Sequence, residues 1–162
     1  MSIKKLIMVV SLSLLTIPVL RAQKYEYVGV AKCKVCHNKP STGAQYKIWE
    51  ASKHAHAMES LKGADAKNPK CLKCHSTYYE VSPDLRAGIT PGEGVSCESC
   101  HGAGSAYKNY GVMKDRSKAV AKGLIIPDEK TCIKCHNSES PNFKGFNYKT
   151  YYAKIAHPIP GK

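Results

Sequence analysis

The sequence predicts one small domain built from helices and irregular loops, with little strand. Two stretches carry helix start and stop signals: one follows Pro40 and ends near Gly63, and the other runs from Ser105 to about Lys122. The strand candidate, residues 25–28, is short, and nothing in the sequence requires it. The mean hydropathy of −0.36 is low, so side chains alone cannot build a large core from 162 residues.

The first 22 residues are typical of an export signal. Lys4 and Lys5 form a charged start, residues 6–20 are apolar, and Ala22 is a candidate cleavage point. The apolar stretch is short for a membrane span, and the alternative is an uncleaved N-terminal anchor. We therefore expect a signal peptide at residues 1–22 and a mature periplasmic domain at residues 23–162, with no integral membrane span after signal removal.

Every cysteine in the sequence belongs to a C-x-x-C-H motif. Such a motif attaches c-type haem, because the two thiols form thioethers with the porphyrin and the adjacent histidine ligates the iron. The sequence therefore predicts four covalently bound c-type haems. The cysteines are Cys33, Cys36, Cys71, Cys74, Cys97, Cys100, Cys132 and Cys135, and the motif histidines are His37, His75, His101 and His136.

Three other uses of paired cysteines compete with haem attachment: disulfides, zinc sites and redox-active dithiols. None of them requires a histidine after each second cysteine. Removing residues 1–22 leaves 140 residues, one predicted haem for every 35. The porphyrins are therefore expected to form much of the core.

The helix expected after Pro40 carries two histidines outside the motifs. His54 shares a helical face with Met58 and Leu61, whereas His56 lies about 200° further round the helix. One helix therefore cannot present both imidazoles to the same iron. Because the irons need sixth ligands, His54 and His56 are both candidate distal ligands, and the alternative is that they are ordinary helix-surface side chains.

Residues 76–96 are rich in proline and glycine and indicate an irregular loop. The first cysteines of the second and third motifs are 26 positions apart, against 38 and 35 for the other two spacings. We therefore expect the second and third haems to be tethered most tightly.

Four features follow the third motif. Met113 is either a possible axial ligand or an ordinary core methionine. Asp128 can cap a short helix that carries the fourth motif. The aromatic stretch of residues 143–152 is suited to packing against a porphyrin or against other side chains. His157, which precedes Pro158, is a candidate distal ligand.

The charge balance argues against nucleic-acid binding. The formal net charge of +13 falls to +10 once Lys4, Lys5 and Arg21 leave with the signal. Four haems bring about eight propionate charges at neutral pH, which scattered lysines offset. No basic run with interleaved aromatic residues resembles a nucleic-acid surface. We therefore expect redox proteins as partners.

Two longer stretches resemble the tetrahaem cytochrome c-554 family. The first starts at Trp49 and continues as His-Ala-His-Ala-Met-Glu-Ser-Leu over residues 54–61. The second, residues 94–104, is Gly-Val-Ser-Cys-Glu-Ser-Cys-His-Gly-Ala-Gly. With the first and fourth motif regions, the resemblance covers most of residues 28–145. It implies a mainly α fold with little strand, closely packed haem pairs and periplasmic electron transfer.

The resemblance also implies roles for single residues. His54 would be the distal ligand of the third haem, and His157 could match the C-terminal histidine that serves the fourth. The second haem of the family has no sixth protein ligand, so the iron held by His75 would be open.

The sequence departs from the family at the first haem. The family takes that distal ligand from a histidine shortly after the third motif, but residues 106–113 contain none. His56 or Met113 could substitute, or the first haem is also open. Simple counting agrees, because only three histidines remain for four sixth positions.

Electron transfer is therefore the leading hypothesis for function. The alternative is a small nitrogen-oxide reductase that acts at the open iron of His75, although no acid can be placed near that site from the sequence. A third possibility is a haem-based sensor or a structural relay in a larger respiratory assembly.

Overall fold

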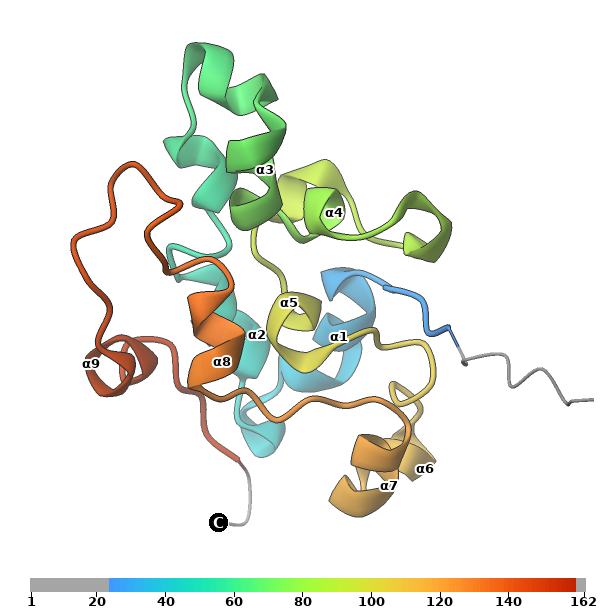
Figure 1. Cartoon of the computed structure of the whole chain (residues 1–162). Coiled ribbons are helices and arrows are strands. Elements are labelled where there is room, and N and C mark those ends of the chain that lie inside the picture. Colours follow the sequence, from blue (N-terminus) through green and yellow to red (C-terminus); the bar gives the residue numbers. More distant parts are fainter. Residues whose placement is uncertain (1–23, 160–162) are drawn as a thin grey trace, which may run out of the picture.

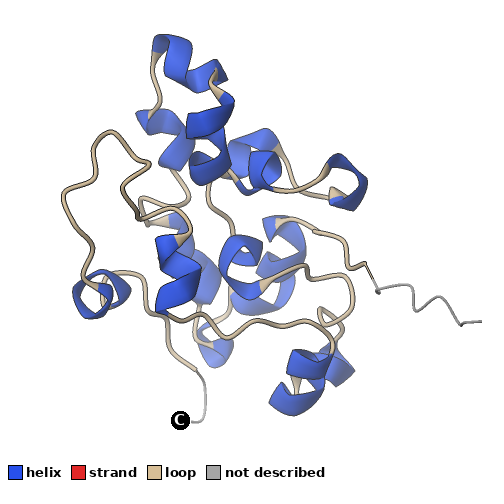
Figure 2. Ribbon diagram, viewed as in Figure 1, coloured by secondary structure: helices blue, strands red, loops and turns tan. Residues whose placement is uncertain are grey.

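The computed structural model describes residues 24–159, which form short helices joined by longer loops (Figure 1). No strand is present in this part of the chain (Figure 2). The strand candidate at residues 25–28 is reduced to one isolated bridge between Tyr27 and Arg86. The predicted fold class, mainly α with little strand, is confirmed. The expected signal peptide lies outside the described residues.

The α-helices are short, and five 3₁₀ turns lie among them in the described region. The α-helices are α1 Val30–His37, α2 Gln45–Glu50, α3 Pro69–His75, α4 Thr77–Glu80, α5 Cys97–His101, α6 Tyr110–Met113, α7 Arg116–Ala121, α8 Glu129–Ile133 and α9 Tyr148–Tyr152. The 3₁₀ turns are η1 Pro40–Thr42, η2 Ala57–Ser60, η3 Gly63–Lys67, η4 Pro83–Leu85 and η5 Pro91–Glu93. Within residues 24–159, no helix has the length and apolar character needed to span a bilayer.

Helices α1 and α5 lie side by side in the middle of the molecule (Figure 1). Helix α3 packs against α4, and α6 packs against α7 at the opposite end of the view. The helices that carry the first and third motifs are therefore neighbours, although 64 positions separate Cys33 from Cys97.

The prediction of one long helix between Pro40 and Gly63 is wrong. Helix α2 ends at Glu50, and the chain then turns until η2 begins at Ala57. A tertiary contact replaces the helical hydrogen bonding, because the backbone N–H of Val95 donates to the carbonyl of His54 at 2.9 Å. The indole of Trp49 donates to the Val95 carbonyl at 2.8 Å. The contact with the 94–96 segment outweighs local helix propensity here.

The helix expected over residues 105–122 is divided into α6 and α7. Asp115 stops the first helix and caps the second, because its carboxylate accepts from the backbone N–H of Lys118 at 3.1 Å. Ser105 does not cap a helix; its hydroxyl accepts from the backbone of Glu26 at 2.9 Å. The expected stop at Gly123 is present, with a φ of 97°.

The cap predicted at Asp128 is confirmed. Its carboxylate accepts from the backbone N–H of Thr131 at 3.1 Å, and the Thr131 hydroxyl accepts from the backbone of Asp128. This capping box starts α8 immediately before the fourth motif. It fixes where the helix begins and therefore which way Cys132 faces.

The side-chain core is small. Among the described residues, the buried apolar side chains are Leu72, Val81, Ile89, Tyr107 and Ala119. Several polar side chains are as deeply buried, and Glu98 is only 1% exposed. A core of this size matches the expectation that side chains supply only part of the interior.

Two distant carboxylates cap the N-terminus of α1. The Glu98 carboxylate accepts from the backbone N–H groups of Val28 at 3.0 Å and Gly29 at 2.8 Å, and Glu93 accepts from Val30 at 3.2 Å. Glu98 also accepts from the N–H of Gly104 at 2.7 Å. Negative charge at this end of a helix is favourable because the first N–H groups have no partner within the helix. Glu98 therefore joins the first motif helix to the third.

Candidate haem-binding site

Each C-x-x-C-H motif begins on a helix. The first three motifs lie on α1, α3 and α5, and the fourth begins on α8 and continues to His136. Helical spacing of three and four places both thiols and the histidine of a motif on one side. No disulfide joins any of the cysteines in residues 24–159. In residues 24–159, no three His, Cys, Asp or Glu side chains gather in a way that could hold a bare metal ion.

Three motif histidines have their Nδ1 atom held by an acceptor. His37 Nδ1 lies 3.2 Å from Gln45 Oε1, His75 Nδ1 lies 2.8 Å from the Ala57 carbonyl, and His101 Nδ1 lies 3.1 Å from the Ile125 carbonyl. An oxygen acceptor fixes the proton on Nδ1, which leaves the Nε2 lone pair for a metal. The donor set therefore fits the role of haem-iron ligands.

The structure brings two further histidines to motif histidines. The ring centroids of His54 and His136 are 6.0 Å apart, and those of His101 and His157 are 5.8 Å apart. Two imidazoles that ligate one metal from opposite sides have centroids roughly 6 Å apart, given metal–nitrogen bonds of about 2 Å. Both pairs therefore have the spacing that an iron between them requires.

These pairs correct the expected assignments. His54 was expected opposite the third motif and His157 opposite the fourth, but His54 faces His136 and His157 faces His101. One side-chain hydrogen bond bears on the position of His157. The Pro158 carbonyl accepts from Gln45 at 3.0 Å, which holds the C-terminal segment close to His37 and α1.

Burial keeps the paired imidazoles neutral. It lowers the pKa of His54, with a smaller contribution from His136, and it also lowers the pKa of His101 and His157. The pKa of His136 is lowered by the same cause. A neutral imidazole is the form that ligates iron, so the electrostatics of both pairs suit that role.

His56 is placed differently. Its side chain is 53% exposed, with Nδ1 2.7 Å from the Glu59 carboxylate and Nε2 2.9 Å from the Glu50 carbonyl. The hydrogen bond to Glu59 is the main cause of its raised pKa. Two acceptors on one ring favour the imidazolium, which has no lone pair for a metal. The structure therefore does not bring His56 to a motif histidine.

His37 and His75 have no second imidazole in ring contact within residues 24–159. Met113, the other candidate for the first haem, ends α6, and α6 packs against α7. The arrangement of these residues favours two paired and two unpaired motif histidines.

The thiols show which motifs are neighbours. A hydrogen bond with Cys97 lowers the pKa of Cys33 and raises that of Cys97. Burial, and then the nearby Cys132, raise the pKa of Cys100 to about 11. Burial, and then Cys74, raise the pKa of Cys135 to about 12. The thiols of the first and third, the third and fourth, and the fourth and second motifs are therefore close enough to influence each other, and the Thr77–Ser99 hydrogen bond joins the second and third motif regions as well.

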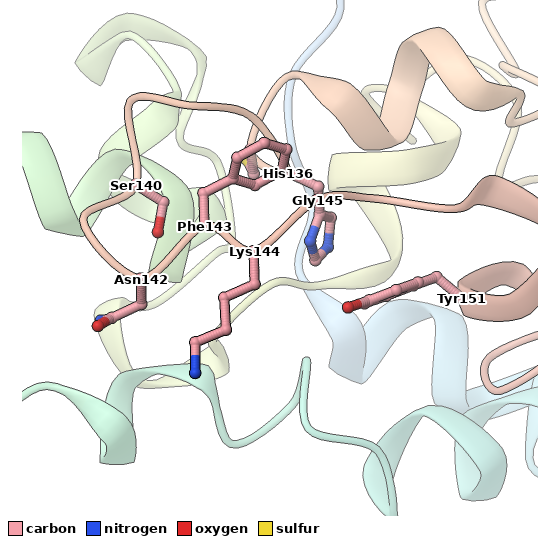
Figure 3. Close-up of a pocket in the computed structure, with 8 residues that line it drawn as sticks. His136, Ser140, Asn142, Phe143, Lys144, Gly145 and Tyr151 are labelled. Atoms are coloured by element: carbon pink, nitrogen blue, oxygen red, sulfur yellow. The ribbon is translucent and has the colours of Figure 1, made fainter.

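A cavity of about 230 Å³ adjoins the fourth motif. Its wall is formed by Cys135, His136, Ser140, Asn142, Phe143, Lys144, Gly145 and Tyr151 (Figure 3). The Phe146 ring stacks on His136 with centroids 4.9 Å apart and planes 19° apart, and Tyr151 lies 5.7 Å from the same ring. The aromatic stretch of residues 143–152 thus lies around the fourth motif histidine.

Sequence reasoning missed Gln45, Glu98 and Phe146. Glu98 occupies a variable position inside a C-x-x-C-H motif, so the motif alone gives no reason to single it out. Gln45 binds Pro158, which is 113 positions away, and Phe146 stacks on His136 from an irregular loop, so no regular spacing marks either residue. The aromatic content of residues 143–152 was the only signal that pointed toward one of them.

Comparison with known proteins identifies similar chains. Residues 32–102 match the family model described as cytochrome c554 and c-prime. Cytochrome c-554 of Nitrosomonas europaea is 30% identical over 154 aligned residues, which cover 74% of this chain and 61% of the relative. The chain therefore spans about three fifths of the length of that relative. No solved structure matches the chain.

Proposed function

Since this chain belongs to the cytochrome c-554 family in the part that the family model matches, residues 32–102, we propose that it carries electrons with four covalently bound haems in the periplasm. The family supports a c-type cytochrome with covalent haem and a role in electron transfer. The number of haems, their ligands and the compartment are the parts that we add. The paired imidazoles, His54 with His136 and His101 with His157, are the observation that carries the proposal.

Each group of residues has a distinct task in this proposal. The eight motif cysteines would hold the porphyrins, and His37, His75, His101 and His136 would bind the irons. His54 and His157 complete the sites of His136 and His101. Haem supplies an iron that alternates between the ferric and ferrous states. The hydrogen bonds at Nδ1 orient the motif histidines and increase their strength as ligands.

The neighbour relations of the motifs support a continuous path for electrons. Helix α1 of the first motif packs against α5 of the third, Cys132 of the fourth motif lies near Cys100 of the third, and Lys73 of the second motif pairs with Glu139 just after the fourth. We infer one row of four haems in the order first, third, fourth, second. The second and third motif regions also meet directly, because the Thr77 hydroxyl lies 2.6 Å from the Ser99 hydroxyl, so the tight tethering of these two haems stays a prediction.

We expect pyridine haemochrome analysis of the purified mature protein to give four haems per chain. Replacing both cysteines of one motif with alanine, for example Cys132 and Cys135, should lower the count to three. A protein without haem, with its cysteines in disulfides, would overturn the proposal. Mass spectrometry of the intact chain under reducing conditions separates the two cases, because thioether-bound haem remains attached and disulfides are reduced.

The site of His75 favours a second candidate function, reduction of a small nitrogen oxide. No second imidazole contacts the His75 ring within residues 24–159, while its Nδ1 is held by the Ala57 carbonyl and lies 3.2 Å from the Ser60 hydroxyl. The proximal ligand is therefore oriented, and nothing among the described histidines occupies the opposite side. An open iron of this kind binds small ligands.

Nitric oxide added to the reduced protein should bind at the site of His75, and also at that of His37, which has no paired imidazole either. We expect a high-spin fraction in the electron paramagnetic resonance spectrum of the ferric protein, and a nitrosyl signal after reduction and addition of nitric oxide. A His75→Ala variant should lose the His75 share of both signals and keep the His37 share. Four low-spin haems that do not respond to nitric oxide would remove the reductase alternative and leave electron transfer.

A further inference from the structure

Gln45, the first residue of α2, contacts two separate parts of the candidate site. Its side-chain oxygen lies 3.2 Å from Nδ1 of His37, the histidine of the first motif. Its side-chain nitrogen donates to the Pro158 carbonyl at 3.0 Å and also to the Thr42 carbonyl. One amide therefore connects the first motif to the C-terminal segment, 113 positions away.

The contact with His37 acts on an iron ligand. An oxygen acceptor at Nδ1 fixes the proton there, orients the ring and makes Nε2 a stronger donor to a metal. A stronger imidazole donor stabilises the ferric state and lowers the reduction potential of the haem it ligates. Gln45 therefore has a direct means to tune the first haem.

The contact with Pro158 acts on the neighbouring residue His157. Pro158 follows His157, whose ring lies 5.8 Å from that of His101, and His157 Nδ1 is buried with no hydrogen-bond partner among the described residues. Of the hydrogen bonds in residues 24–159, the one from Gln45 is the bond that ties residues 157–159 to the rest of the protein. The position of His157 thus depends on Gln45.

The backbone beside this bridge is shaped to allow it. Gly43 has a φ of 97°, and a Cβ atom there would lie 2.7 Å from the Gln45 side-chain nitrogen and 3.0 Å from the Pro158 carbonyl oxygen. The Gln45 amide would have to shift to make room for that atom, and 3.0 Å from the backbone oxygen is tighter than nearly all real Cβ contacts. Glycine is therefore what permits the amide and the Pro158 carbonyl to meet.

We propose that Gln45 is a positioning residue that couples the first and third haem sites: its oxygen orients His37, and its nitrogen seats His157 opposite His101. This inference rests on the proposed function, since it requires haems at the first and third motifs. A change at Gln45 therefore alters two haems that are attached to different helices.

Two substitutions separate the two contacts. Gln45→Leu removes both, so the potential of the first haem should rise and His157 should detach more readily from the third. Gln45→Glu keeps an acceptor for His37 but presents a carboxylate to the Pro158 carbonyl, so the first potential should fall while His157 still loosens. Cyanide competes with His157 for the third iron, and its apparent affinity should rise about fivefold in both variants, the effect of one lost hydrogen bond.

The experiment uses the purified holoprotein, with potentials from a redox titration followed by electron paramagnetic resonance. A His157→Ala variant identifies the signals of the third haem. Lys47→Ala, an exposed change on the same helix, is the matched control and should alter neither haem. Gly43→Ala should raise the cyanide affinity of the third haem without removing the acceptor of His37.

Unchanged potential and unchanged cyanide affinity in both Gln45 variants would overturn the inference. A change confined to the first haem would overturn the coupling between the two sites. If the unmodified protein lacks haem at the first or third motif, the proposed function fails instead, and mass spectrometry of its haem-bearing peptides shows this before any variant is made.

Discussion

Replacing Glu98 with alanine should lower the free energy of unfolding by about 3–5 kcal/mol. The Glu98 carboxylate is 1% exposed and is the acceptor for the backbone N–H groups of Val28, Gly29 and Gly104. Each buried N–H that loses its acceptor costs roughly 1–3 kcal/mol. The substitution also leaves a void between α1 and the turn at residues 102–104. Gly104 lies close to the carboxylate there, because a Cβ atom added at Gly104 would be 2.9 Å from Glu98 Oε1.

The measurement is chemical denaturation of the purified holoprotein, followed by far-ultraviolet circular dichroism. Glu98→Gln should be less harmful, because an amide oxygen keeps part of the hydrogen bonding, although its NH₂ group then faces a backbone donor. Glu139→Gln removes an exposed carboxylate that pairs with Lys73 and should have no measurable effect. Equal stability of Glu98→Ala and the Glu139 control would show that the buried carboxylate has no role in holding the first motif to the third.

The sequence predicts well whatever is encoded over a few residues. The motif at residues 132–136 and the cap at Asp128 that precedes it are both local patterns, and the cap forms as expected. The motif implies its chemistry directly, because the thioethers and the proximal ligand are five residues apart or less. The small core also follows from composition alone.

The helix expected after Pro40 shows what local sequence patterns cannot predict. Its capping and spacing signals are present in the sequence. The His54 carbonyl, however, accepts a hydrogen bond from the Val95 N–H, and the Trp49 indole donates to the Val95 carbonyl. No local pattern encodes a contact across more than 40 residues. The same limit applies to His54 and His157: a residue type identifies a possible ligand, but only long-range contacts decide which motif histidine it lies beside.

The two long-range links, Glu98 and Gln45, act on the same pair of motifs from opposite ends of α1. Glu98 holds the N-terminus of α1 to α5, and Gln45 contacts His37 at the C-terminus of α1. Glu98 therefore ties the start of α1 to α5, and Gln45 ties the end of α1 to α2. Electron transfer between two haems depends on their separation and orientation, so this fixation is the structural basis we expect for a constant rate between the first and third haems.

Replacing His54 or His157 with alanine should each convert one low-spin haem into a high-spin haem. His54 should affect the fourth haem and His157 the third, because their rings lie 6.0 Å from His136 and 5.8 Å from His101. Loss of the only sixth protein ligand leaves an iron open to water or added ligands. Electron paramagnetic resonance and the optical spectrum of the ferric protein measure the change.

Removal of one haem tells the two pairings apart. In a Cys132→Ala, Cys135→Ala background, which lacks the fourth haem, His54→Ala should produce no further high-spin signal, whereas His157→Ala should still convert the third haem. The opposite result, with His54 effective and His157 silent, would restore the assignment that the family resemblance implied. His56→Ala serves as the control in both backgrounds, since the Glu59 carboxylate and the Glu50 carbonyl already bind both nitrogens of that ring. The spin state of each haem therefore shows whether His54 or His157 is its distal ligand.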